Sequence, residues 1–178
     1  MGNKYLIVID MQNDFVDGAL GTPEAQAIAD AVVEEAKSFD GTVAFTLDTH
    51  GENYLSSQEG ANLPVPHCIK GTPGWQLIPA LDSVAHERNA RIFEKPTFGS
   101  TDLAAWLQAE NATNPIESIE LVGVCTDICV VSNALLIKAV LPEVPLVVDA
   151  ALCAGVTPAA HEAALATMRS CQVQVLNA

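Results

Sequence analysis

Tyr5-Leu6-Ile7-Val8-Ile9 is an unbroken run of apolar residues, and an acidic residue, Asp10, follows it directly. The run has the length of a strand and does not alternate between polar and apolar residues. This pattern is typical of a strand in a parallel sheet that helices cover on both faces. Further runs of strand length, most of them nearly continuous in apolar residues, occur at Val43 to Leu47, Arg91 to Phe93, Ile119 to Val124, Leu146 to Val148 and Val173 to Leu176.

Segments with helical spacing of their apolar residues separate these runs. They are expected at Pro23 to Phe39, Thr101 to Glu110, Thr126 to Leu141 and Pro158 to Cys171. Thr22 and Thr157 are suitable caps for the first and last of them, because each precedes a proline that favours the first helical position. The alternation predicts an α/β fold, a single-domain three-layer αβα structure over residues 1–178 with a mainly parallel, about six-stranded Rossmann-like sheet.

Composition limits the classes of protein to which the chain can belong. Hydrophobic residues make up 49% of its 178 residues, and 8 Lys and Arg stand against 22 Asp and Glu, a formal net charge of −14. A globular protein of this charge lacks the basic surface that nucleic acid or an anionic membrane requires. No secretory signal pattern begins the chain, no apolar stretch reaches the ~20 residues that cross a bilayer, and its five cysteines form no disulfide framework. We therefore expect a soluble, cytoplasmic protein.

Reactive side chains follow four of the predicted strands. Asp10, Asp48, Lys95 and Cys129 should lie together at one edge, because the carboxyl ends of parallel strands meet there and ligands bind there. Any buried strand must end in something polar, so one such residue alone carries little information. Carboxylates, a lysine and a cysteine at the same edge are better explained by a catalytic site.

Cys129 has the surroundings of a nucleophile. If Thr126 or Asp127 caps the following helix, the thiol lies in its first turn, where the helix dipole favours a thiolate. Asp10 and Lys95 would then supply the base and the counter-charge. The alternative is a small buried hydrophobe, an interpretation that suits Cys153 and Cys171 better. The spacing of Cys125 and Cys129 also resembles half a metal site or a disulfide pair.

A second group of residues could bind a metal ion. Asp48 and His50 are two apart at a strand end and face the same way. The segment from Gly51 to Gly74, expected to be one long loop, adds Glu59 and His67. Two histidines and two carboxylates suit Zn²⁺, Fe²⁺ or Mn²⁺, although Glu59 would by default be surface charge. The other histidines, His86 and His161, are expected to be solvent-exposed.

Taken together, these segments resemble the isochorismatase-like cysteine hydrolase superfamily, and within it the nicotinamidases. The resemblance spans the chain and is carried by Asp10-Met11-Gln12-Asn13-Asp14-Phe15, Asp48-Thr49-His50, His67-Cys68, Gly71-Thr72-Pro73-Gly74, Lys95 and Gly123 to Val130. It implies that Asp10, Lys95 and Cys129 form the catalytic triad. It places the metal on Asp48, His50 and His67, with Glu59 as the fourth ligand by its nine-residue offset from His50.

The resemblance also implies a substrate and a way to bind it. The small molecule is nicotinamide, hydrolysed to nicotinate and ammonia in the salvage of pyridine nucleotides. Its ring nitrogen binds the metal, which is Zn²⁺ with Fe²⁺ or Mn²⁺ as alternatives, while Phe15 and Phe98 are candidates for packing on the ring. A cis peptide at Val124-Cys125 would turn the Cys125 N–H toward that of Cys129 as an oxyanion hole. A homo-oligomer is left open.

Other functions remain open on the residues alone. A metal-free amidase or an isochorismatase would use the triad without the metal ligands. A non-catalytic metal-binding or redox module would use Cys125 and Cys129. A nucleotide-binding α/β protein is disfavoured, because no glycine-rich phosphate loop follows the first strand.

Overall fold

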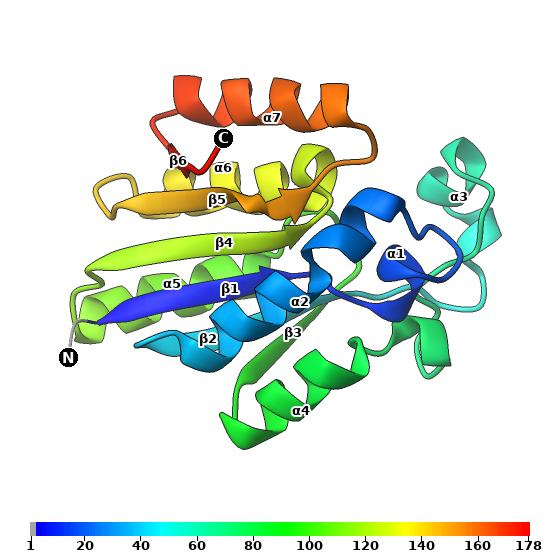
Figure 1. The fold of residues 1–178 in the computed structure, drawn as a ribbon, viewed down its shortest axis with the longest axis horizontal. Coiled ribbons are helices and arrows are strands. Elements are labelled where there is room, and N and C mark those ends of the chain that lie inside the picture. The colour runs from blue at the N-terminus through cyan, green and yellow to red at the C-terminus, as the bar shows by residue number, and fades with distance from the viewer. Residues whose placement is uncertain (1–2) are drawn as a thin grey trace.

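The computed structural model describes residues 3–178 and contains one six-stranded parallel sheet (Figure 1). The strands are β1 (Lys4–Ile9), β2 (Thr42–Asp48), β3 (Arg91–Lys95), β4 (Ser118–Val124), β5 (Leu146–Ala154) and β6 (Gln174–Leu176). They lie in the order β3-β2-β1-β4-β5-β6, and each pair of neighbours is parallel. The predicted fold class is confirmed.

Helices cover both faces of the sheet. They are α1 (Asn13–Val16), α2 (Pro23–Ser38), α3 (Gln58–Asn62), α4 (Pro79–Glu87), α5 (Thr101–Thr113), α6 (Val131–Val140) and α7 (Pro158–Ser170). Short turns of other helical types are η1 (Tyr54–Ser56), η2 (Pro73–Trp75) and the π-helical η3 (Thr126–Val130). Apolar residues of α2 and α4 form the core on one face, and those of α5, α6 and α7 form the core on the other.

The apolar run of β1 shows why both faces need helices. Leu6 and Val8 belong to the core that α2 and α4 share, whereas Ile7 and Ile9 belong to the opposite core. All four side chains are fully buried. Because alternate side chains of a strand point to opposite faces, an unbroken apolar run requires cover on both sides.

Several elements differ from their predicted bounds. The segment from Gly51 to Gly74 is not one continuous loop, because it contains η1, α3 and η2; the Ser57 hydroxyl begins α3 by accepting the N–H of Gly60. Helix α4 was not expected. Strands β3 and β5 extend beyond Phe93 and Val148, and the predicted helix from Thr126 divides into η3 and α6.

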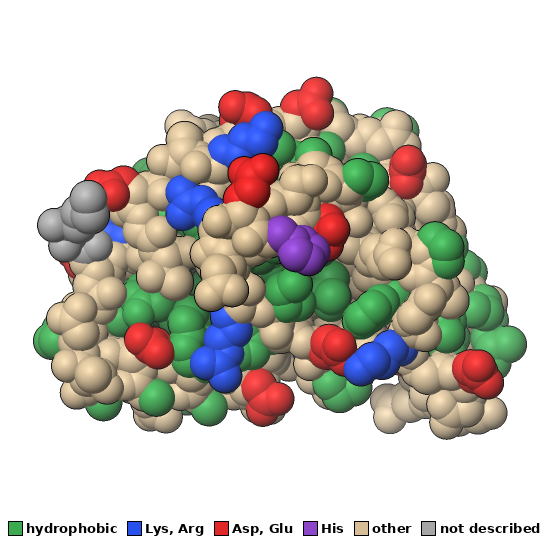
Figure 2. Space-filling model, turned by 90° about the horizontal axis from the view of Figure 1, so that it is seen from below, with side chains coloured by type: hydrophobic (Ala, Val, Ile, Leu, Met, Phe, Trp, Pro, Cys, Tyr) green, Lys and Arg blue, Asp and Glu red, His purple; other side chains and the backbone are tan. Residues whose placement is uncertain are grey.

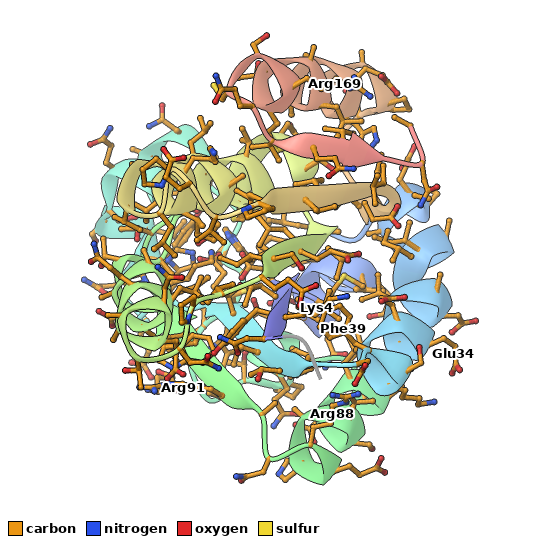
Figure 3. The ribbon with its side chains drawn as sticks, turned by 90° about the vertical axis from the view of Figure 1, so that its left-hand side faces the viewer. Lys4, Glu34, Phe39, Arg88, Arg91 and Arg169 are labelled. Atoms are coloured by element: carbon orange, nitrogen blue, oxygen red, sulfur yellow. The ribbon has the colours of Figure 1, made fainter. Side chains whose placement is uncertain are left out.

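Arg88 fixes α4 to the end of α2. Its guanidinium donates to the carbonyl oxygens of Lys37, Phe39 and Gly41 at 2.9, 2.7 and 3.2 Å. Arg88 and Phe39 are labelled at this junction in Figure 3. These contacts hold the connection from α2 into β2, whose far end carries part of the site.

The surface has few basic side chains, as expected for a chain with 8 Lys and Arg against 22 Asp and Glu. Figure 2 shows the few Lys and Arg side chains of one face separated from one another by acidic and apolar ones. Within residues 3–178, no helix is both long and apolar enough to cross a membrane.

Glu120 of β4 provides a test of the α2-facing core. It is half-buried, and burial together with the nearby carboxylates of Glu35 and Asp149 raises its pKa to about 7. Because the pKa of this acid is higher in the folded than in the unfolded chain, the folded state should lose stability as pH rises from about 4.5 to about 7.

We predict that Glu120→Gln raises the melting temperature at pH 8 by ~2–4 °C, which corresponds to ~1 kcal/mol in a domain of this size after solvent screening. The gain should shrink as pH falls toward 5, where the parent side chain is protonated in the folded state. Thermal melts of both proteins at several pH values are the measurement. A gain that is the same at pH 5 and pH 8 would show that the Glu120 charge does not destabilise this face.

Candidate active site and metal centre

The carboxyl ends of four adjacent strands bring together the reactive side chains. Asp10 follows β1, Asp48 and Lys95 are the last residues of β2 and β3, and Cys129 lies in η3 after β4. The strand order changes direction between β1 and β4, and this is the position at which open α/β sheets bind ligands. Asp10 and Cys129 therefore lie on the two sides of that switch point.

Lys95 is the centre of the first cluster. Its Nζ lies 2.6 Å from Oδ2 of Asp10 and 3.4 Å from Sγ of Cys129. All three side chains are buried. The hydroxyl of Thr46 donates to Oδ1 of Asp10 at 2.6 Å, so the carboxylate is held from both sides. The cluster therefore contains a carboxylate that can accept a proton, an ammonium group and a thiol.

Burial and the neighbouring charges set the protonation of this cluster. Burial raises the pKa of Asp10, and Lys95 only partly offsets it. Burial disfavours the charge of Lys95, but the adjacent Asp10, Cys129 and Asp48 raise its pKa above the usual value. Burial and Asp10 also raise the pKa of Cys129 well above that of a free thiol.

The helix cap that would favour a thiolate at Cys129 is not formed. Thr126 and Asp127 were the candidates for it, yet neither side chain caps η3. The Asp127 carboxylate accepts the N–H of Val156, and the Thr126 hydroxyl lies 2.8 Å from Nδ1 of His161. Because burial and Asp10 favour the neutral thiol, a base beside Cys129 is needed to form the thiolate, and Asp10 belongs to the same cluster.

Two further predictions for single residues are wrong. His161 is half-buried through its contact with Thr126 rather than solvent-exposed, and Cys171 is exposed rather than buried. His86 is exposed and Cys153 is buried, as expected. Cys125 and Cys129 are both free thiols.

The backbone before Cys129 has two unusual features. The peptide bond between Val124 and Cys125 is cis, as the resemblance implied. Gly123 has φ +114°, and a Cβ there would lie 2.2 Å from the carbonyl oxygen of Ile9. Only glycine permits both this conformation and the close approach of β4 to β1.

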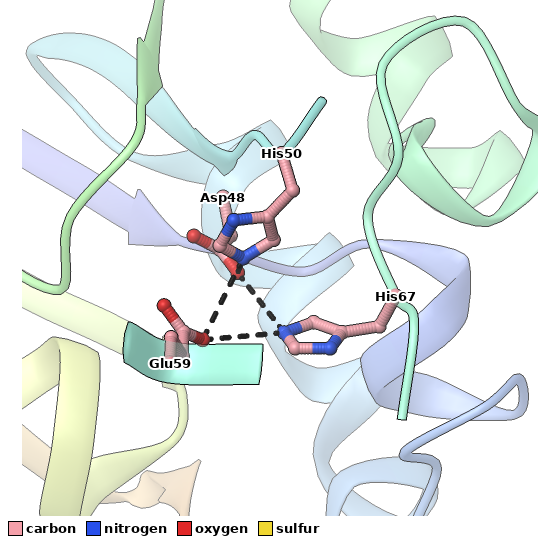
Figure 4. Close-up of side chains that lie close together, drawn as sticks. All are labelled: Asp48, His50, Glu59 and His67. Carbon is pink, nitrogen blue, oxygen red and sulfur yellow. Dashed lines mark hydrogen bonds and ion pairs between the residues drawn. The ribbon is translucent and has the colours of Figure 1, made fainter. Parts of the chain in front are cut away.

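Four side chains form the second cluster, next to the first (Figure 4). Nε2 of His50 lies 3.0 Å from Oδ2 of Asp48, and Nε2 of His67 lies 3.5 Å from the same oxygen. Oε1 of Glu59 is 3.6 Å from both imidazoles. Donors that share one divalent ion, each ~2.1 Å from it, are ~3.0 to ~3.4 Å apart, so this set fits such a metal, and an ion with more than four ligands keeps a position for substrate.

Each donor is presented by a different piece of structure. Asp48 ends β2 and His50 follows it, whereas Glu59 lies in α3 and His67 in the segment beyond. Nδ1 of His67 lies 2.8 Å from the carbonyl oxygen of Val65, which can only accept, so Nε2 keeps its lone pair for a metal. Burial opposes the charge of Asp48, but hydrogen bonds with both histidines and the charge of Lys95 hold its pKa well below the usual value.

One cavity of about 700 Å³ borders both clusters, through Cys129 of the first and through Asp48, Glu59 and His67 of the second. The predicted site residues among its walls are Phe15, Asp48, Glu59, His67, Phe98, Cys125 and Cys129. Walls that the sequence did not indicate are Leu20, Thr22, Gln58, Asn62, Leu63, Pro96, Thr97, Ile128 and Val156. Thr46, behind Asp10, was also missed, although a hydroxyl within an otherwise apolar strand was a usable signal.

The structure is an α/β protein with two adjacent clusters, one with a thiol beside an ammonium group and a carboxylate, and one with four side chains that could hold a metal ion. Comparison with known proteins agrees. The isochorismatase domain model matches residues 4–178. A nicotinamidase/pyrazinamidase of Mycobacterium tuberculosis is 31% identical over 193 aligned positions, which cover 97% of this chain and 98% of that protein.

Solved structures give the same result. The crystal structure of nicotinamidase/pyrazinamidase from Bacillus subtilis has a TM-score of 0.82 at 29% identity, and the match covers 98% of this chain and 100% of that one. A pyrazinamidase of Pyrococcus horikoshii in complex with zinc has a TM-score of 0.79 at 29% identity, with 98% of both chains covered. The chain belongs to the isochorismatase family, and within that family it is similar to nicotinamidases.

We predict that the four donors contribute unequally to metal affinity. His50→Ala removes a donor held at the end of a buried strand, and it should lower the zinc content of the purified protein strongly. Glu59→Ala should weaken zinc binding less, because the Glu59 side chain is 23% exposed on a short helix and water can replace its carboxylate. Zinc titration of the metal-stripped proteins by calorimetry compares the two.

The contradicting results are specific for each residue. Full zinc content in both His50→Ala and His67→Ala would remove the metal centre as described. Unchanged affinity in Glu59→Ala would reduce it to three protein ligands.

Proposed function

We propose that this protein hydrolyses nicotinamide to nicotinate and ammonia through a thioester on Cys129. The proposal rests above all on one observation. The buried cluster of Asp10, Lys95 and Cys129 lies beside four side chains that could hold a metal ion, and Cys129 lines the same cavity as three of those four. The relatives named nicotinamidase and pyrazinamidase support the substrate class. The reaction would return nicotinamide to pyridine nucleotide synthesis.

Asp10 is the general base. Its carboxylate is buried beside both Nζ of Lys95 and the Cys129 thiol, and it accepts the proton of that thiol. Lys95 stabilises the thiolate that forms, because its Nζ contacts both Asp10 and the sulfur. The thiolate then attacks the carboxamide carbon and forms the C–S bond.

The oxyanion and the leaving group need separate partners. The backbone N–H groups of Cys125 and Cys129 donate to the oxyanion, and one such donor typically stabilises the transition state by ~3 kcal/mol. Asp10 returns its proton to the departing ammonia. A water molecule, deprotonated by the same carboxylate, then cleaves the thioester, which releases nicotinate and restores the thiol.

Asp48, His50, Glu59 and His67 would hold the divalent ion, for which zinc is the first candidate. When bound, the ion would supply a Lewis acid for the ring nitrogen of the substrate, which would orient the carboxamide toward Cys129. Phe15 and Phe98 border the same cavity and supply apolar contact for the ring. Nicotinamide is neutral, so the net charge of −14 does not repel it.

We predict that Cys129→Ala lowers kcat for nicotinamide by about four orders of magnitude or more, because the nucleophile is lost and only binding remains. The variant should retain its fold and zinc content, since a single buried sulfur is removed. Cys125→Ala should have a far smaller effect, because its contribution comes from the backbone. An assay of ammonia release, with circular dichroism and metal analysis of each variant, makes the comparison.

Each possible result separates two functions. Ammonia release by Cys129→Ala at a substantial fraction of the parent rate would exclude the covalent mechanism. A metal-free parent that is active on other amides would indicate a metal-free amidase of the same family. A parent that binds zinc but hydrolyses neither nicotinamide nor pyrazinamide would favour a non-catalytic metal-binding module.

A further inference from the structure

Gln12, which precedes α1, and Asp14, in its first turn, contact the two halves of the metal centre. The Gln12 side chain is fully buried, and its amide forms two hydrogen bonds with the backbone of Asp48: Oε1 accepts the N–H at 2.8 Å, and Nε2 donates to the carbonyl at 2.9 Å. Nε2 also donates to the carbonyl of Trp75 at 2.7 Å. Both backbone groups of the metal-facing Asp48 are thus fixed by one side chain.

Asp14 holds the other half. Its Oδ2 accepts the N–H of Cys68 at 2.7 Å, and its Oδ1 accepts that of Ala19 at 3.3 Å. Cys68 directly follows His67 and has φ +46°, a conformation that a non-glycine residue rarely adopts. The ring of His67 lies 5.5 Å from that of Phe15. His67 is therefore fixed through its following peptide by Asp14 and through its ring by Phe15.

Gly74 leaves room for this arrangement. A Cβ at Gly74 would lie 2.2 Å from Oδ2 and 2.3 Å from Oδ1 of Asp14. The only residue that fits beside the carboxylate is one without a side chain. The catalytic chemistry does not explain why Gly71 to Gly74 is part of the sequence motif. The contact of Gly74 with Asp14 gives this segment a structural function, because it packs against the Asp14 carboxylate.

We propose that Gln12 and Asp14 are positioning residues of the metal centre, which hold Asp48 and His67 in the geometry of the bound state before the ion arrives. The inference rests on the metal centre of the proposed function. Neither residue belongs to the set of four donors, and each acts through the backbone of one donor or of its neighbour. The segment that begins with the general base Asp10 thus also determines the affinity of the adjacent metal centre.

The test uses near-isosteric variants, so that packing is preserved. Gln12→Glu replaces the donor Nε2 by an acceptor that faces two carbonyls. Asp14→Asn loses one of the two acceptors. Each should weaken zinc binding by about 10–100-fold, the usual effect of losing a residue that orients a ligand. Asn13→Ala is the matched control. Among the described residues the Asn13 side chain hydrogen-bonds the carbonyl of Pro73 and no group of Asp48 or Cys68, so the zinc affinity of this variant should stay within about twofold of the parent.

The readout is the dissociation constant of zinc for the metal-stripped full-length proteins, measured by calorimetry, with the melting temperature of each metal-free protein recorded separately. A purely structural role would lower the melting temperature and leave the zinc affinity of the folded protein unchanged. If Gln12→Glu fails to fold, Asp14→Asn decides. Gly74→Ala is a third variant, which displaces the same carboxylate without changing it.

Each outcome has one meaning. Parent affinity in the folded Asp14→Asn and Gln12→Glu variants would overturn the proposal, as would equal weakening in Asn13→Ala. A parent that binds no zinc would overturn it together with the metal centre. A parent that binds zinc, with the expected losses in the variants but no hydrolysis of nicotinamide, would support the positioning role and contradict the proposed function alone.

Discussion

The buried ammonium group of Lys95 is the constraint on which the rest of the site depends. Lys95 is 1% exposed, and a buried charge without partners costs several kcal/mol. Two carboxylates, Asp10 at 2.6 Å and Asp48 at 3.6 Å, compensate it. The pairing of β2 with β3 places Asp48 opposite Lys95 in register, so the sheet itself brings cation and carboxylate together. Asp10 belongs to the cluster that contains the thiol, and Asp48 belongs to the four side chains that could hold a metal. Lys95 therefore contacts both clusters.

The sequence predicted the sheet and the reactive edge well because both follow from local patterns. An unbroken apolar run such as Tyr5 to Ile9 is stable only between two layers of helices, and a parallel sheet sends all such runs toward the same edge. Asp10, Asp48 and Lys95 could therefore be placed side by side from their positions after the runs. The spacing of Asp48 and His50 likewise follows from the twofold repeat of an extended chain.

What the sequence did not reveal depends on contacts between distant segments. The helix that carries Glu59 is too short to show a period, and its start is set by a single Ser57 bond. Burial and Asp10 raise the pKa of the Cys129 thiol, and the helix cap that would have favoured a thiolate is absent because Thr126 and Asp127 contact other groups. Gln12 was visible as part of a motif, but its hold on Asp48 spans 36 residues.

In the proposed mechanism, Cys129 becomes acylated during turnover. Rapid acid quenching of a single turnover on nicotinamide, followed by mass spectrometry of the intact and proteolysed protein, tests this claim most directly. We expect a mass increase of one nicotinoyl group, located on Cys129, that appears and decays while ammonia is released. Release of ammonia with no covalent adduct at any time, or an adduct on Cys125 instead, would contradict the account.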